Sequence, residues 1–120
     1  MVRSDGGRRS YLLPGDSIRS KNKSYLLTYQ PDGNLVIMQG AIWVVPDVVA
    51  PRKAGRASMQ DDGNFVLYDA DGKEYWSTQS AHGGVGPFKL ILQRDRNLVL
   101  YDRNNKVLYT SGTQLEMMDG

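Results

Sequence analysis

Gln60-Asp61-Asp62-Gly63-Asn64-Phe65-Val66-Leu67-Tyr68 decides the fold, because its pattern Gln-x-Asp-x-Asn-x-Val-x-Tyr is written three times in the chain. The third copy runs from Gln93 to Tyr101. The first runs from Gln30 to Met38, with methionine in place of the final tyrosine. A large aromatic residue follows each copy in turn: Trp43, Trp76 and Tyr109. This repetition predicts three similar units, each too small to bury its own apolar face, packed around a shared core.

The residues of each copy predict a hairpin. Asp-Gly at 32–33 and 62–63 favours a tight turn, because glycine tolerates the positive φ that such a reversal requires. The third copy has Arg96 at the glycine position, so a non-glycine residue occupies the turn at some conformational cost. After each turn, side chains alternate between the two faces of a strand. The residues predicted to face the core are Leu35, Ile37, Phe65, Leu67, Leu98 and Leu100.

A second turn is expected after each of these strands, at 39–40, 69–72 and 102–105, followed by a strand that carries the aromatic residue. The resulting prediction is an all-β fold of three antiparallel sheets with pseudo-threefold symmetry. Trp43, Trp76 and Tyr109 are expected to fill its centre.

Composition narrows the class of protein further. A chain of 120 residues fits one domain, and its 13 glycines with short apolar runs are typical of all-β proteins. The absence of cysteine excludes disulfides and thiol chemistry. The net charge of +2 is too small to indicate a nucleic-acid partner, and no apolar run is long enough for membrane insertion.

The ends of the chain are polar. We predict a flexible arm over residues 1–10, a folded domain over 11–115 and a tail over 116–120. The N-terminal residues lack the apolar run of a secretory signal. The location is therefore open: cytoplasmic as written, or secreted if a signal once preceded Met1.

The sequence offers no set of residues for catalysis, for a metal or for a cofactor. His82 is the only histidine, and no cysteine accompanies it. The stretch Asp69-Ala70-Asp71-Gly72 has the start of a calcium loop without the later ligands, which favours a turn. We therefore predict that the chain is not an enzyme.

The three motif copies, with Leu13-Pro14-Gly15-Asp16-Ser17-Ile18 ahead of them, resemble those of the bulb-type, mannose-binding lectins of the snowdrop-agglutinin kind. The resemblance covers about residues 11–115 and implies the β-prism II fold. It also implies that mannose and mannose-containing glycans are the partners. In that family, Asp and Asn bind the axial 2-hydroxyl, Gln the 3-hydroxyl and Tyr the 4-hydroxyl, while Val packs against the ring carbons.

The resemblance assigns the carbohydrate-binding residues by position. They are Gln60, Asp62, Asn64, Val66 and Tyr68 in the second copy, and Gln93, Asp95, Asn97, Val99 and Tyr101 in the third. The degenerate first copy keeps Gln30, Asp32, Asn34 and Val36 but has Met38. We expect its site to be weak or silent. The residue types suit a sugar, whose hydroxyls both donate and accept hydrogen bonds.

Two further expectations rest on the same resemblance. Relatives exchange their C-terminal strand between subunits, which implies a homodimer formed through residues 107–113. The motif can also survive as turn scaffolding alone, since folds host unrelated functions. A protein-interaction or bacteriocin-like toxin module with incidental sugar sites is the alternative function.

Overall fold

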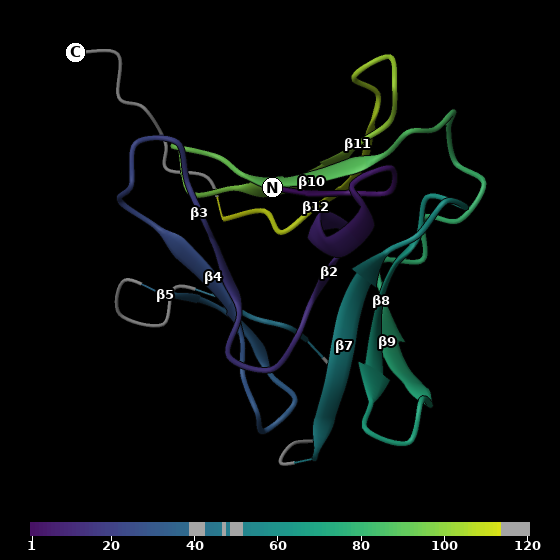
Figure 1. Cartoon of the computed structure of the whole chain (residues 1–120). Helices are drawn as coiled ribbons and strands as arrows, with labels where there is room; N and C mark the ends of the chain where they lie inside the picture. The colour runs from purple at the N-terminus through teal and green to yellow at the C-terminus, as the bar shows by residue number, and fades with distance from the viewer. Residues whose placement is uncertain (39–42, 47, 49–51, 114–120) are drawn as a thin grey trace.

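The computed structural model describes residues 1–38, 43–46, 48 and 52–113. Within them the chain forms three four-stranded antiparallel sheets, the sides of a triangular prism, with one sheet for each motif copy (Figure 1). The first sheet contains β3 (Ser17–Arg19), β4 (Leu26–Tyr29), β5 (Leu35–Met38) and β6 (Trp43–Val44). The second contains β2 (Tyr11–Leu12), β7 (Ala54–Met59), β8 (Phe65–Asp69) and β9 (Glu74–Ser77). The third contains β1 (Val2–Arg3), β10 (Lys89–Leu92), β11 (Leu98–Tyr101) and β12 (Val107–Thr110). The predicted all-β fold of three antiparallel sheets is confirmed.

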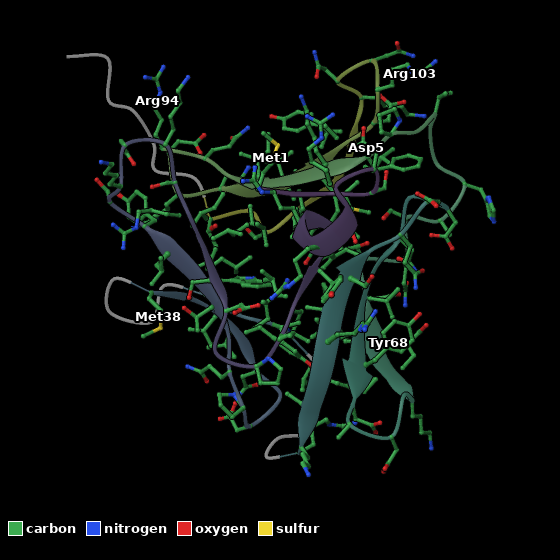
Figure 2. The ribbon with its side chains drawn as sticks, in the orientation of Figure 1. Met1, Asp5, Met38, Tyr68, Arg94 and Arg103 are labelled. Atoms are coloured by element: carbon green, nitrogen blue, oxygen red, sulfur yellow. The ribbon has the colours of Figure 1, made fainter. Side chains whose placement is uncertain are left out.

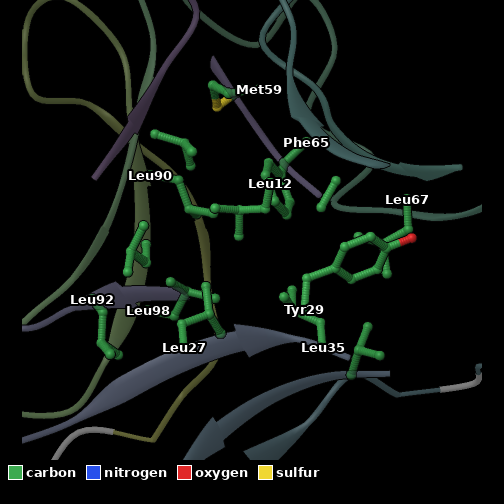
Figure 3. Close-up of a cluster of buried hydrophobic side chains, with 14 of the residues drawn as sticks. Leu12, Leu27, Tyr29, Leu35, Met59, Phe65, Leu67, Leu90, Leu92 and Leu98 are labelled. Atoms are coloured by element: carbon green, nitrogen blue, oxygen red, sulfur yellow. The ribbon is translucent and has the colours of Figure 1, made fainter. Parts of the chain in front are cut away.

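The core lies between the three sheets and is built mainly from the two central strands of each, with Val2, Leu12 and Ile18 added from the outer strands (Figure 3). Along β5, β8 and β11, every second side chain points into the core. The six predicted core residues are at most 2% exposed: Leu35, Ile37, Phe65, Leu67, Leu98 and Leu100. Because apolar side chains from all three sheets share this interior, no unit can bury its apolar face alone.

The N-terminal residues are not the flexible arm that the sequence predicted. Val2 is 1% exposed and pairs with Leu90, so β1 forms the outer strand of the third sheet. The 3-10 helix η1 (Gly7–Ser10) then leads to β2, which pairs with β7 in the second sheet. These strands supply partners for backbone groups that would otherwise line an open sheet edge. Two-residue strands are too short to show periodicity, which explains the error.

The aromatic trio does not fill the centre of the prism as predicted. Trp43, Trp76 and Tyr109 lie on the outer strands β6, β9 and β12, and they are only partly buried against the core. Trp76 and Tyr109 meet edge to face, with ring centroids 5.9 Å apart. Side chains from the central strands already fill the space along the axis of the prism. The larger aromatic rings therefore pack at the edge of the core. The predicted turn at 39–40, the domain boundary at 115 and the tail at 116–120 lie outside the described residues.

A pair of tyrosine hydroxyls joins the first unit to the second. The side chain of Tyr29 is fully buried, and its hydroxyl lies 3.0 Å from the Tyr68 carbonyl oxygen and 2.9 Å from the Tyr75 hydroxyl. The Tyr75 hydroxyl donates to the carbonyl oxygen of Gly33 at 2.7 Å. Burial raises the pKa of both phenols, which keeps them protonated as donors. The two hydroxyls thus make three polar contacts between the units, and their two protons form two hydrogen bonds at a time.

One predicted consequence is that Tyr29→Phe destabilises the fold by about 1–2 kcal/mol, because it leaves buried acceptors without a donor. Tyr25→Phe is the matched control, since the Tyr25 hydroxyl makes no hydrogen bond within the described residues. Urea unfolding of the two variants measures the difference. Equal losses of unfolding free energy would show that the hydroxyl pair contributes nothing specific.

The carboxylate of Asp102 closes the outer turn of the third unit. It is 3% exposed and accepts hydrogen bonds from the backbone N–H groups of Lys106 at 2.9 Å, Val85 at 3.1 Å and Asn104 at 2.8 Å. These donors favour the charged form and hold the pKa of Asp102 below its usual value. The same contacts fasten the segment around Val85 to the third sheet.

A pH dependence of stability follows from Asp102. Its pKa is lower in the folded state, so the stabilisation is present above the unfolded-state value of about 3.9 and is lost as pH falls through the folded-state value. We expect Asp102→Asn to lower the Tm at pH 7, with the gap to the wild type closing as the pH falls through the lowered folded-state pKa of Asp102. The exposed Asp71 gives a control, Asp71→Asn. Thermal melts in which the Asp102→Asn gap stays constant from pH 7 to pH 2 would contradict the assignment.

Candidate functional site

The three motif copies fold into the same turn. In each, the N–H of Gln donates to the Asn carbonyl four residues later, and the residue before Asn donates back to the Gln carbonyl, at 2.8–3.1 Å. The residue before Asn has positive φ: 92° at Gly33, 92° at Gly63 and 64° at Arg96. The predicted conformational cost therefore falls on Arg96. The loop has three residues, a type I turn closed by a left-handed residue.

The aspartate of each turn is held by its own backbone. One carboxylate oxygen accepts from the Asn N–H two residues later, at 3.1 Å for Asp32, 2.9 Å for Asp62 and 3.0 Å for Asp95. Within the described residues the second oxygen accepts no hydrogen bond. Each turn therefore presents one carboxylate oxygen in a fixed position as an acceptor.

The residues that directly follow β9 and β12 fix the asparagine in the second and third copies. The Asn64 side-chain oxygen accepts from the Thr78 hydroxyl at 3.2 Å and the Ser80 N–H at 3.3 Å. In the third copy, Asn97 accepts from the Ser111 hydroxyl at 3.1 Å and the Gly112 N–H at 3.2 Å. Because the side-chain oxygens of Asn64 and Asn97 already accept hydrogen bonds within the protein, the NH2 group of each remains free to donate to a ligand.

The first copy lacks the hydroxyl at the corresponding position. Val45, Thr78 and Ser111 are equivalent, because their N–H groups donate to the carbonyls of Leu35, Phe65 and Leu98, the first residues of β5, β8 and β11. Val45 has no hydroxyl to offer Asn34. Sequence reasoning missed this hydroxyl role. The signal for the hydroxyl role was a Thr or Ser two residues after the aromatic in the other copies.

Glutamine and tyrosine form the other half of the second and third sites. The Gln60 side-chain amide donates to the Tyr68 hydroxyl, and that of Gln93 donates to the Tyr101 hydroxyl. Each phenol keeps its own proton for a further acceptor, and each glutamine keeps its carbonyl oxygen. Met38 has no hydroxyl, so it offers Gln30 only a weakly accepting thioether and has no proton to donate. Figure 2 shows Met38 and Tyr68 on different sheets, at the corresponding ends of their motifs.

The valines of the motif are more covered than a sugar-stacking patch requires. Val66 and Val99 lie on the outer faces of their sheets but are 1% and 3% exposed. Val66 stands opposite Ser58 on β7 and Ser77 on β9. The surface of the second site is therefore polar, and its valine forms the floor.

The first turn is packed into the rest of the protein. The Arg52 N–H donates to the Asp32 carbonyl at 2.8 Å, and its guanidinium lies 4.3 Å from the centre of the Tyr75 ring. Tyr75 in turn holds the carbonyl of Gly33. These contacts favour a structural role for the first turn.

Among the described residues, no group of three or more His, Asp or Glu side chains is placed to hold a metal ion. Those residues also contain no helix with the length and apolar character needed to cross a membrane.

Comparison with known proteins gives relatives of one kind. No protein-family model matches the chain. The B-type lectin plumieribetin of Scorpaena plumieri is 30% identical over 96 residues, covering 80% of this chain and 84% of that protein. The lectin of Marasmius oreades superposes with a TM-score of 0.79 at 25% identity, over 93% of this chain and 89% of its own. The monomeric monocot mannose-binding lectins of Gastrodia elata superpose with a TM-score of 0.76 at 30% identity, over 95% and 97%.

These relatives agree with the architecture and with the expected class of protein. The three-sheet fold is the β-prism II of lectins. The relatives bind carbohydrate without converting it, so the prediction that the chain is not an enzyme is confirmed. The match to plumieribetin, 30% identical over 80% of this chain, establishes the relationship in sequence. The chain belongs to the B-type, or bulb-type, lectin family and is a carbohydrate-binding protein.

Proposed function

We propose that the protein binds terminal mannose through the second and third motif copies. The observation that carries this proposal is the hydrogen-bond pattern that the two copies share. In each, the Asn amide oxygen is occupied by the residues that directly follow β9 or β12, and the Gln amide is occupied by the Tyr hydroxyl. The groups left over are a carboxylate oxygen, an NH2 group, a phenolic proton and an amide oxygen, which together complement sugar hydroxyls.

The arrangement favours mannose for a reason of stereochemistry. Asp62 and Asn64 lie two residues apart in the same turn, and the carboxylate of Asp62 is an acceptor whereas the NH2 group of Asn64 is a donor. One hydroxyl can satisfy both by donating to the carboxylate and accepting from the amide. In the family resemblance that hydroxyl is the axial 2-hydroxyl of mannose. Glucose carries it equatorially, and an unmatched polar group costs about 1–3 kcal/mol.

The first copy is proposed to be weak or silent. Asp32 keeps its fixed carboxylate oxygen, but Val45 offers no hydroxyl to Asn34 and Met38 offers no phenol to Gln30. Of the four polar groups, the phenol is thus missing, and the Asn34 and Gln30 amides lack the partners that support their counterparts. A sugar at this turn would meet fewer fixed partners, and each lost hydrogen bond lowers affinity.

Avidity rather than single-site affinity would make such a protein useful. An open site with a few hydrogen bonds is expected to bind a monosaccharide with a Kd of about 1 mM. Two sites on one chain raise the effective concentration of a branched glycan. A homodimer would multiply this effect. In the structure, β12 pairs with β11 of its own chain. Dimerisation stays a prediction that light scattering can test.

The test replaces the carboxylates one at a time. Asparagine keeps the oxygen that accepts the turn N–H but removes the charge, so Asp62→Asn and Asp95→Asn preserve the turn. We expect each to weaken its own site about tenfold or more, and the double variant to lose methyl α-mannoside binding in calorimetry. Asp32→Asn is the matched control and should leave binding unchanged.

Methyl α-glucoside serves as the ligand control in the same experiments. The proposal is wrong if the double variant binds methyl α-mannoside as the wild type does, or if the glucoside binds equally well. Sugar binding that disappears while a biological activity persists would favour the alternative of an interaction or toxin module.

A further inference from the structure

The third turn carries positive charge where the other two carry none. Its three loop residues are Arg94, Asp95 and Arg96, against Asp61-Asp62-Gly63 in the second copy and Pro31-Asp32-Gly33 in the first. Arg94 and Asp61 are therefore equivalent positions with opposite charge, and both are exposed. The polar groups proposed to contact sugar are the same in the two copies, so a difference in ligand would have to come from the residues around them.

A loop from the first sheet brings another cation to the third turn. The loop 20–25 joins β3 to β4, and Asn22 holds it in shape, because the Asn22 side-chain oxygen accepts from the Ser20 hydroxyl at 2.7 Å and the Ser24 N–H at 3.2 Å. The NH2 group of Asn22 donates across the sheets to the carbonyl of Arg94, at 3.3 Å. Lys21 is thereby positioned beside a turn that lies more than seventy residues away in sequence.

The loop and the turn enclose a hollow that adjoins the proposed third site. Its volume is about 380 Å³, within the range of small-ligand sites. The lining residues are Lys21, Ile91, Leu92, Gln93, Arg94 and Asp95. Gln93 and Asp95 belong to the proposed sugar site, so a sugar at that site would border the hollow. Figure 2 shows Arg94 at this end of the molecule, directed outward.

The two cations at the hollow are available for a ligand. Lys21 and Arg94 are exposed, and their side chains make no hydrogen bond or ion pair with any of the described residues. Arg96 differs, since its guanidinium donates to the Thr113 carbonyl at 2.8 Å. At the other end of the motif, the Lys89 ammonium lies 5.8 Å from the centre of the Tyr101 ring. The third site is thus bordered by positive charge at both ends.

From this geometry we propose that the third site takes a mannoside that carries a phosphate or sulfate ester, with the ester in the hollow between Lys21 and Arg94. Arginine and lysine bind such oxyanions through charge-assisted hydrogen bonds. The second site, with Asp61 at the equivalent position, repels the same group and takes neutral mannose. The two sites of one chain therefore differ in ligand. This inference rests on the mannose-binding function proposed above.

A single NMR titration reads the two sites separately. The side-chain NH2 signals of Asn64 and Asn97 report the second and third sites of the wild-type protein. The ligands are methyl α-mannoside, its 2-, 3- and 6-sulfates, and mannose 6-phosphate. We expect at least one ester to bind at Asn97 about fivefold more tightly than the neutral mannoside in low salt, and at Asn64 no more tightly. The sulfates and the phosphate distinguish the two ester types.

Variants and salt then test the cause. Lys21→Gln with Arg94→Gln should bring the ester-to-neutral affinity ratio at Asn97 down to about one, as should about 0.5 M NaCl, which screens exposed charges. Lys73→Gln, an exposed lysine in the outer turn of the second unit, is the matched control and should leave the ratio unchanged.

The outcomes separate this inference from the proposed function. If the neutral mannoside shifts Asn97 but no ester binds more tightly there, the ester preference is wrong and mannose binding stands. The inference also fails if the gain survives the double variant or occurs equally at Asn64. If the neutral mannoside shifts neither signal, the proposed mannose function itself is wrong.

Discussion

The hydrogen bond between a hydroxyl at the end of β9 or β12 and the asparagine of the turn links the fold to the proposed function. Thr78 and Ser111 each donate to the amide oxygen of that asparagine. The same two hydroxyls accept from the backbone N–H groups of Phe65 and Leu98, at 3.1 and 3.0 Å, so they also bind the end of β9 or β12 to the start of β8 or β11. One interaction therefore holds the unit together and turns its free NH2 donor outward. Where Val45 replaces the hydroxyl, the first unit keeps the strand but loses this support for a ligand site.

The turns can be precise because the three units stabilise one another. Each sheet contributes the two central strands that form the core, while β1 and β2 close the third and second sheets from the far end of the sequence. The hydroxyls of Tyr29 and Tyr75 connect the first unit to carbonyls at Gly33 and Tyr68. Since the backbone of each turn is fixed from several sides, an exposed surface can present polar groups in a defined arrangement before any ligand binds.

Much of this could be predicted from the sequence, because it depends on local patterns that are repeated. Alternation after the turns identified the core residues, and the Asp-Gly pairs identified the hairpins. The errors have a common origin in contacts between distant residues. The two-residue strands β1 and β2 are too short to show periodicity. The position of Trp76 beside Tyr109 depends on how much of the prism's centre the side chains of the central strands already fill. The contact of Asn22 with Arg94 joins different units and leaves no local signal.

The central claim is that an aspartate oxygen and an asparagine NH2 group converge on one sugar hydroxyl in two of the three turns. A crystal structure of the protein soaked with methyl α-mannoside tests it most directly. The account predicts sugar density at the second and third turns, with the 2-hydroxyl within hydrogen-bonding distance of Asp62 and Asn64 in one and of Asp95 and Asn97 in the other. Well-diffracting crystals with both turns open to solvent and empty at saturating sugar, or with the sugar bound only elsewhere, would contradict it.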